Sequence, residues 1–336
     1  MPKNPQSSNV RPTLLYYEIL GFQPSTRAYL ERCFRVVTLP DPGHDTPGVL
    51  WEVRACYAPM GFLFDRQKID ACPRLKVIAT PTTGILHIDH EYAAARSISI
   101  CSLKNQGALL NSITCTAELT WGLILALGRH LLPAMDSVLN GRWEGRSFGE
   151  RTPKMFSRMS LGVIGLGRLG GLVARYGAAF GMQVFYYDPY VADERYARCA
   201  SPGELARCCD VVSVHAHLTP ETQGLVDAAF INSMPPGSFI VNTARGGIVD
   251  ETALLAALKS GHLAGAALDM LEGEHLPGFK DKLREHPLVR YAETHDNLII
   301  TPKMGGATVE AWERTERHLV DMIRSAFDRE KGVEPH

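Results

Sequence analysis

The sequence has no excess of charge of either sign, since 35 lysine and arginine residues face 36 aspartate and glutamate residues, a formal net charge of −1. This balance excludes a strong electrostatic field for nucleic acid or a membrane surface as the organising principle. The 8 cysteines include no Cys-x-x-Cys pair. We therefore expect neither a metal site nor a secreted disulfide framework, and a reduced, cytoplasmic setting is favoured.

Long apolar runs are also missing. The most apolar stretch, residues 119–127, is too short to span a bilayer, and residues 1–12 lack the apolar segment of a signal peptide. The chain has 336 residues, of which 45% are hydrophobic and 21% charged. This composition is ordinary for a globular protein, and the length predicts two domains. We expect a soluble protein with no membrane partner.

Strand-like and helix-like stretches alternate along the chain, which predicts α/β architecture with mainly parallel sheets. Residues 116–131 carry leucines at a spacing of four and predict a long helix. Residues 141–154 show no periodicity. The other expected strands are 13–17, 49–56, 75–79, 98–101, 161–164, 183–187, 211–214, 238–242, 264–268 and 297–301. The other expected helices are 26–34, 89–96, 168–180, 203–207, 227–232, 251–260 (capped by Asp250 and Gly261) and 307–327.

A glycine-rich turn joins the strand expected at 161–164 to the helix that follows it. Gly165, Gly167 and Gly170 form the pattern G-x-G-x-x-G. The first glycine allows a tight turn, the second lets a pyrophosphate approach the backbone, and the third lets helix and strand pack closely. Asp188 ends the next strand, where a carboxylate accepts hydrogen bonds from the ribose of NAD and repels the extra phosphate of NADP. The pattern predicts NAD binding.

Four charged side chains follow three successive strands of the same series. Arg245 comes after the first of these strands, Asp269 and Glu274 after the second, and Lys303 after the third. Because ligands of parallel sheets bind beyond the carboxyl ends of the strands, we expect the four groups at one edge. A guanidinium suits a 2-oxo-carboxylate, and a proton donor backed by a carboxylate suits a carbonyl–alcohol couple.

The chain resembles the D-isomer-specific 2-hydroxyacid dehydrogenases, especially the members described as phosphoglycerate-dehydrogenase-like. The resemblance extends from about residue 75 to residue 316. It is carried by LKVIATPTTGILHID (75–89), NSITCTAELTWGLILALGR (111–129), LGVIGLGRLG (161–170), VHAHLTPETQGLV (214–226), VNTARGGIVDETALLAAL (241–258), GAALDMLEGE (265–274) and LIITPKMGGAT (298–308).

The resemblance implies two Rossmann-like domains. A doubly wound parallel-sheet NAD domain, residues 117–304, is inserted into a flavodoxin-like substrate domain made of residues 1–116 and 305–336. A cleft would close over the substrate about hinges near Thr116 and Gly305–Gly306. Residues 141–154 match the dimer arm of the family, which implies a homodimer through the NAD domain.

The resemblance also implies roles for individual residues. Arg245 matches the arginine that holds the substrate, and Glu274 matches the acid that supports the proton-transfer residue. The loop that binds the substrate carboxylate through backbone N–H groups is Thr82, Thr83, Gly84 and Ile85. Cofactor contacts are implied for Thr116, Gly165, Gly167, Arg168, Leu169, Gly170, Asp188, His215, Thr222, Thr243, Ala244, Asp269, Gly305 and Gly306.

The sequence departs from the family at its proton-transfer residue. The family pattern is T-P-H-x-G, whereas this chain has T-P-K-M-G with Lys303 at the histidine position. Lys303 as the catalytic acid/base is our main hypothesis. The alternatives are a permanent ammonium that polarises the substrate, or a different proton route with His275 as donor. His217, where the family has proline, is interpreted as a variant that the fold tolerates.

We expect an NAD-dependent enzyme that interconverts a 2-oxo acid and a D-2-hydroxy acid. The alternative is a catalytically weak, dehydrogenase-like NAD(H) sensor or corepressor. Glu274 argues against formate as hydride donor, and Thr83 argues against phosphite. The substrate itself stays open: Tyr57, Pro59, Met60 and Phe62 are candidates for its side-chain pocket. The loop expected at 276–297 has cations that suit a phosphorylated or dicarboxylate substrate, although a solvated surface loop is the default interpretation.

Overall fold

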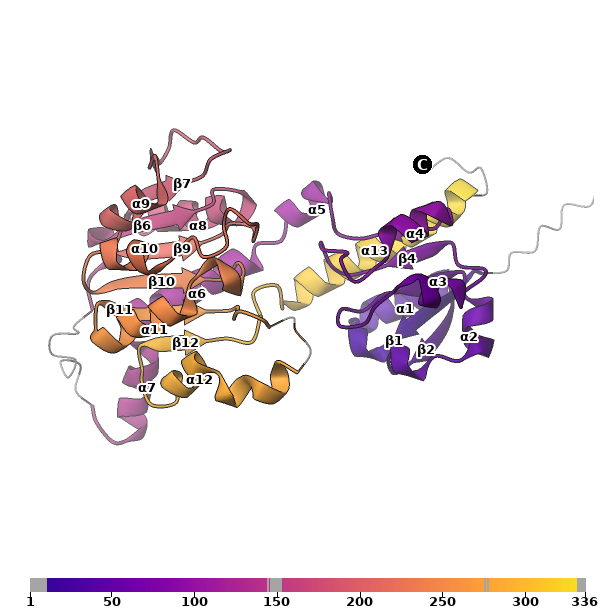
Figure 1. The fold of residues 1–336 in the computed structure, drawn as a ribbon, viewed down its shortest axis with the longest axis horizontal. Helices are drawn as coiled ribbons and strands as arrows, with labels where there is room; N and C mark the ends of the chain where they lie inside the picture. Colours follow the sequence, from indigo (N-terminus) through magenta and orange to yellow (C-terminus); the bar gives the residue numbers. More distant parts are fainter. Residues whose placement is uncertain (1–10, 144, 146–152, 275, 277, 331–336) are drawn as a thin grey trace, which may run out of the picture. The chain divides into compact units, whose positions relative to one another are not determined.

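The computed structural model describes residues 11–143, 145, 153–274, 276 and 278–330, and its ribbon is drawn in Figure 1. The chain forms two compact units. The described residues up to Ile113, with those from Ala307 onwards, make the first unit, and Thr114–Gly306 make the second. The chain therefore passes twice between the units.

The first unit is built on a five-stranded parallel sheet of order β2-β1-β3-β4-β5. This strand order is that of flavodoxin-like folds. Helices pack on both faces, α2, α3 and α4 on one and α1 and α13 on the other. The strands are β1 (Thr13–Tyr17), β2 (Arg35–Leu39), β3 (Ala55–Tyr57), β4 (Val77–Ala79) and β5 (Ser99–Cys101). The helices are α1 (Pro24–Cys33), α2 (Pro47–Glu52), α3 (Arg66–Asp70), α4 (His90–Ala95), α5 (Gly107–Asn111) and α13 (Val309–Glu330), with 3-10 turns η1 (Glu18–Leu20) and η2 (Pro42–His44).

The second unit is built on a seven-stranded parallel sheet of order β12-β11-β10-β9-β6-β7-β8. Helices α9 to α12 cover one face, and α6 and α8 cover the other (Figure 1). The strands are β6 (Ser160–Ile164), β7 (Gln183–Tyr187), β8 (Ala197–Arg198), β9 (Val211–Val214), β10 (Ser238–Asn242), β11 (Leu263–Leu268) and β12 (Leu298–Ile300). The helices are α6 (Cys115–Gly128), α7 (Leu131–Leu139), α8 (Arg168–Ala179), α9 (Pro202–Cys208), α10 (Ala228–Ser233), α11 (Glu251–Ser260) and α12 (Pro287–Ala292), with 3-10 turns η4 (Phe156–Arg158), η5 (Gly246–Ile248) and η6 (Lys280–Glu285).

Counted from β6, the strand order is 3-2-1-4-5-6-7, the doubly wound order of Rossmann folds with one strand added. The order reverses between β6 and β9, so the loops after these strands diverge and leave a crevice for a ligand. The predicted fold class, two Rossmann-like α/β domains, is confirmed. The predicted helix caps of α11 are also present, since Asp250 accepts backbone N–H groups and Gly261 is left-handed.

Two expectations for the first unit are wrong. The strand expected at 49–56 is mostly helix α2, because Thr46 caps the backbone N–H of Val49 and Pro47 occupies the first helical turn. Only Ala55–Tyr57 remain as strand β3. The edge strand β2 was not predicted, because its five residues are all at least partly exposed and carry little apolar periodicity.

Helix α6 owes its apolar character to burial in the second unit. Gly107–Gly128 is long and apolar enough to cross a membrane by length and composition alone. In the structure this stretch is divided between α5 and α6, and α6 packs on β10, β11 and α8. A helix that is apolar on most sides is typical of a protein core. The predicted long helix ends earlier than expected, since His130 is left-handed and α7 starts a new direction.

Replacing Trp121 by alanine tests this packing. Trp121 is 5% exposed, stacks on Phe180 at 4.6 Å between ring centroids and donates from its indole N–H to the carbonyl of Val173 at 3.1 Å. We expect Trp121→Ala to lower the free energy of unfolding by about 3–5 kcal/mol in denaturant titrations. Trp51→Ala, at a site 57% exposed, is the control. Equal losses in the two variants would contradict the packing argument.

Candidate active site

The glycine turn has the geometry of a phosphate-binding loop. Gly165 has a φ of +85°, a conformation that favours glycine. A Cβ on Gly170 would overlap the carbonyl oxygen of Gly165, whereas a Cβ on Gly167 would meet nothing within 4 Å. The loop is thus closed on its inner side and open at Gly167, where α8 begins with its N–H groups unpaired. These residues fit a dinucleotide pyrophosphate.

Asp188 lies at the end of β7 and is 7% exposed. Its carboxylate accepts the backbone N–H groups of Leu166, Tyr190 and Val191 at 2.7–2.9 Å. One oxygen therefore also holds the glycine turn in place. A pocket beside Asp188 is lined by Tyr187, Pro189, Arg198, Cys199 and Ala200. Its place at the carboxyl end of β7 suits the adenosine half of a dinucleotide.

His215 follows β9 and supports the same turn. Its backbone lies 3.0 Å from the position of a Cβ on Gly165, so β9 and the glycine turn are in close contact. The His215 ring pairs with the Ser213 hydroxyl at 2.7 Å, and burial lowers the pKa of His215 to about 4. The imidazole is therefore neutral at physiological pH and adds no charge beside the turn.

Arg245 is presented by a turn that Asn242 folds. The buried Asn242 side chain accepts the N–H of Ala244 and donates to the carbonyl of Arg245, at 3.0 and 2.8 Å. The Arg245 residue is exposed, and its guanidinium donates to the carbonyl of Ala244 at 2.6 Å. Our sequence interpretation missed Asn242, although an asparagine at a strand end is a recognisable signal for a side-chain-folded turn.

Asp269 holds the turn that carries Lys303. Its carboxylate accepts the Thr301 hydroxyl at 2.6 Å and the backbone N–H groups of Met304 and Gly305, both at 2.8 Å. The backbone N–H of Lys303 donates to the carbonyl of Asp269 at 3.1 Å. Asp269 is 2% exposed, so this carboxylate is stabilised by the turn that it binds. Gly305 also lacks room for a side chain, because a Cβ would lie 3.1 Å from the Asp269 carboxylate.

Lys303 and Glu274 form an ion pair. The Lys303 ammonium donates to Glu274 Oε1 at 2.6 Å, with 57% of the lysine side chain and 15% of the glutamate side chain exposed. Lys303 has a φ of +55°, a left-handed conformation that is uncommon for a residue other than glycine. The arrangement brings an acid–base pair to the carboxyl edge of β11 and β12. The alternative donor, His275, lies outside the described residues.

The other predicted residues lie in both units. Of the substrate loop, Thr82 belongs to the first unit, where its hydroxyl donates to the carbonyl of Gly84 at 2.6 Å. In the second unit, the Thr243 hydroxyl pairs with that of Thr120 at 2.8 Å, a contact that our sequence interpretation missed. Thr222 donates to the carbonyl of His217 at 2.5 Å and so folds its own loop. Tyr57 is fully buried in the first unit's core, which corrects its expected place in a substrate pocket.

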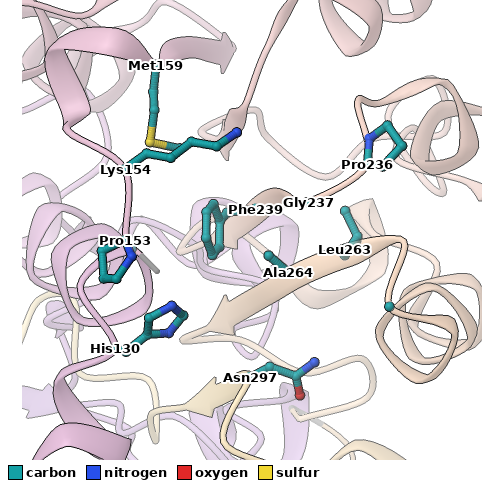
Figure 2. Close-up of a pocket in the computed structure, with 12 residues that line it drawn as sticks. His130, Pro153, Lys154, Met159, Pro236, Gly237, Phe239, Leu263, Ala264 and Asn297 are labelled. Atoms are coloured by element: carbon teal, nitrogen blue, oxygen red, sulfur yellow. The ribbon is translucent and has the colours of Figure 1, made fainter. Parts of the chain in front are cut away.

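A second pocket lies at the opposite, amino edge of the same sheet (Figure 2). It is lined by residues at the starts of β10, β11 and β12, among them Phe239, Leu263 and Asn297, with His130 and Lys154 on the other side. It is therefore separate from the strand ends that carry Arg245, Asp269 and Lys303. Among the residues that the structure describes, no three His, Cys, Asp or Glu side chains are grouped so that they would hold a metal ion.

Comparison with known proteins identifies the family. Residues 121–305, which are 185 of the 336 residues, match the model for the D-isomer specific 2-hydroxyacid dehydrogenase, NAD binding domain. The chain belongs to this family. Its second unit is accordingly the NAD-binding domain of a D-isomer specific 2-hydroxyacid dehydrogenase, as the glycine turn and Asp188 predicted.

Individual relatives of this D-isomer specific 2-hydroxyacid dehydrogenase agree. The chain is 35% identical over 267 residues to the D-3-phosphoglycerate dehydrogenase of Mycobacterium leprae, covering 78% of this chain and 47% of that protein, or about half its length. A solved structure from Thermus thermophilus is 30% identical with a TM-score of 0.79, covering 96% of this chain and 98% of that one. The D-lactate dehydrogenase of Aquifex aeolicus, solved with NAD and lactic acid, is 28% identical with a TM-score of 0.74 and coverages of 96% and 100%.

The glycine turn of this family member is tested by a pair of neighbouring substitutions. Gly170→Ala places a methyl group against the Gly165 carbonyl, so we expect at least about tenfold weaker NADH binding, or 1.4 kcal/mol, in fluorescence titrations. Gly171→Ala, whose Cβ would lie 3.9 Å from the nearest atom, is the matched control and keeps its affinity. Equal affinities of the two variants would show that the turn does not contact the cofactor.

Proposed function

We propose that the protein is an NAD-dependent oxidoreductase that interconverts a 2-oxo acid and a D-2-hydroxy acid. The observation that carries the proposal is the 2.6 Å pair of Lys303 and Glu274, on the same sheet edge as the glycine turn. Such a pair supplies what a carbonyl–alcohol couple needs beside its hydride carrier, namely a proton donor with a carboxylate that orients it. The unpaired cysteines suit a reduced, cytoplasmic compartment.

NAD, when bound, accepts or supplies the hydride. The glycine turn and the start of α8 would hold its pyrophosphate, and Asp188 would face its adenosine ribose. We propose NAD rather than NADP, because the Asp188 carboxylate would repel a 2′-phosphate. Its oxygens already receive three backbone N–H groups, which leaves roughly one of four acceptor positions for a ribose hydroxyl.

The substrate carboxylate would be bound by Arg245 and by backbone N–H groups of the loop at 82–85. A guanidinium binds a carboxylate through two parallel hydrogen bonds and so fixes its plane. Arg245 is exposed at the strand end, and its turn is held by Asn242 independently of any ligand. In this assignment residues 1–116 with 305–336 form the substrate domain and 117–304 the NAD domain.

Lys303 would transfer the proton. In reduction its ammonium donates to the carbonyl oxygen of the 2-oxo acid, and in oxidation the resulting amine accepts the hydroxyl proton. Glu274 would orient the lysine and stabilise its charged form. The function of this lysine replaces that of the family's histidine.

The backbone at Lys303 supports this assignment. A left-handed residue other than glycine costs about 1–2 kcal/mol. An ion pair as exposed as that of Lys303 returns typically 0.2–1 kcal/mol, so the pair does not offset the strain through stability. Strained residues that the surrounding structure holds in place are common at active sites, and here the Asp269 carboxylate holds the turn.

Substitution of Lys303 tests the proposed proton transfer. We expect Lys303→Ala to lower kcat for 2-oxo acid reduction by about 10²–10⁴-fold, because the proton donor is lost. Lys303→His keeps a donor and loses much less, and NADH binding is unchanged in both variants. Lys259→Ala removes an exposed lysine of α11 and is the control. Unchanged turnover in Lys303→Ala would remove Lys303 from the mechanism.

A panel of 2-oxo acids separates the enzyme from the alternative function. NADH oxidation with at least one of them supports the dehydrogenase. Tight NADH binding without turnover of any of them would favour an NAD(H) sensor or corepressor instead.

We also propose that the protein forms a homodimer through its NAD domain. Helix α7 exposes an apolar face in which Leu132, Met135 and Leu139 are 55%, 58% and 73% exposed. The residues after α7, 141–154, match the family's dimer arm in sequence, and part of this segment lies outside the described residues. A second copy of the chain covers such a face by two-fold symmetry, the commonest arrangement of soluble oligomers.

Light scattering coupled to size-exclusion chromatography tests the dimer. We expect a wild-type dimer and a monomer for Met135→Asp, because a carboxylate at the centre of the apolar face opposes its burial. Ile19→Asp, at a site of the first unit that is 57% exposed, should leave the dimer intact. A monomeric wild-type protein would overturn the proposal.

A further inference from the structure

The Glu251 carboxylate binds both ends of the segment that carries Glu274. Glu251 is the first residue of α11, and 13% of its side chain is exposed. Its Oε1 accepts the backbone N–H of Glu272 at 2.7 Å. Its Oε2 lies 3.1 Å from His286 Nε2. The residues between these two contacts, 273–285, thus form a loop closed at its base by one buried carboxylate.

The hydrogen bonds of His286 define its side of this closure. Its Nδ1 accepts the backbone N–H of Leu288 at 3.3 Å and so caps helix α12. The remaining proton is therefore on Nε2, which donates to Glu251. The Phe279 ring packs against the imidazole edge at 6.3 Å between centroids. His286 is thus held by the loop, by α12 and by Glu251 together.

The turn at 271–274 has no freedom to move on its other side. A Cβ on Gly246 would overlap the backbone of Leu271 and Glu272, so these two segments are in direct backbone contact. The N–H of Glu274 donates to the carbonyl of Leu271 at 3.4 Å, which closes the turn. Glu274 therefore reaches Lys303 from a turn fixed by Gly246 on one side and by Glu251 on the other.

We propose that Glu251 and His286 are positioning residues of the proton-transfer pair: they hold the 271–274 turn so that the Glu274 carboxylate meets the Lys303 ammonium. Neither residue touches the reacting atoms. The proposal rests on the proposed function for its catalytic consequence, whereas the placement of Glu274 stands on the geometry alone.

The charges around Glu251 agree with this role. The carboxylates of Glu251 and Glu272 repel each other, and burial further raises the pKa of Glu251, whereas the Glu272 N–H and His286 lower it. Burial of an acid with only two partners costs stability unless both hydrogen bonds are kept. A pair of this kind is informative about geometry rather than about stability.

Chemical labelling of Lys303 tests the placement of Glu274 without any turnover. A mild acylating reagent reacts with amines, and a paired ammonium reacts more slowly than a free one. In peptide mass spectrometry of the full-length protein we expect Glu251→Gln to raise the labelling rate of Lys303 about as much as Glu274→Gln does. The labelling of Lys259 in the same samples is the internal control. An unchanged rate at Lys303 in Glu251→Gln would overturn the proposal, whether or not the protein is an active dehydrogenase.

A double-mutant cycle tests the catalytic consequence. Displacement of a catalytic group by about 1 Å can lower rates by about 10²-fold, so we expect Glu251→Gln to lower kcat by about tenfold or more. Because Glu251 acts through Glu274, the same substitution in a Glu274→Gln background should change kcat by less than about twofold. An equal loss in both backgrounds would show independent action and contradict the proposal. The KM for NADH stays unchanged in each variant.

Two histidine variants distinguish positioning from general destabilisation. His286→Asn keeps the cap of α12 but does not reach Glu251, so kcat falls; His286→Gln restores a donor near the Nε2 position and recovers part of the rate. Asp227→Ala removes the cap of α10 in the same unit and is the control for lost stability. If Asp227→Ala lowered kcat and raised Lys303 labelling as much as His286→Asn, the effect would be one of stability, and the positioning role would be wrong.

Discussion

The arrangement of the site depends on one buried carboxylate. Asp269 lies at the end of β11 and takes the Thr301 hydroxyl and two backbone N–H groups from the turn after β12. These bonds compensate the burial of its charge, and they also impose the left-handed backbone of Lys303. Without them, the turn has no reason to present the lysine towards Glu274. The strand pairing of β11 and β12 brings the two segments into reach.

The doubly wound topology explains why the remaining groups converge. All seven strands of the second unit are parallel, so every strand ends at the same edge. The glycine turn follows β6, Asp188 ends β7, His215 follows β9 and Arg245 follows β10. Each of these turns is folded by its own side-chain contacts, such as those of Asn242. The site is therefore assembled from rigid local units rather than from one flexible loop.

Much of this was predictable from sequence, because apolar runs and glycine spacing act locally. The strands at 183–187 and 238–242 and the helix at 251–260 lie where the pattern placed them. The pattern failed where a cap overrode apolar content, as at Thr46 and α2. It also carried no information on the left-handed Lys303 or on the bridge from Glu251 to His286, because these depend on residues brought together only by the fold.

The backbone contact at Gly246 has a consequence for how new specificities arise in this scaffold. The segment next to Arg245 and the segment that leads to Glu274 touch without intervening side chains, so neither has room to shift against the other. Variation that enlarges or reshapes the substrate range is therefore excluded from this junction. It must accumulate in the first unit, whose loops are free to diverge while the reaction centre keeps its dimensions.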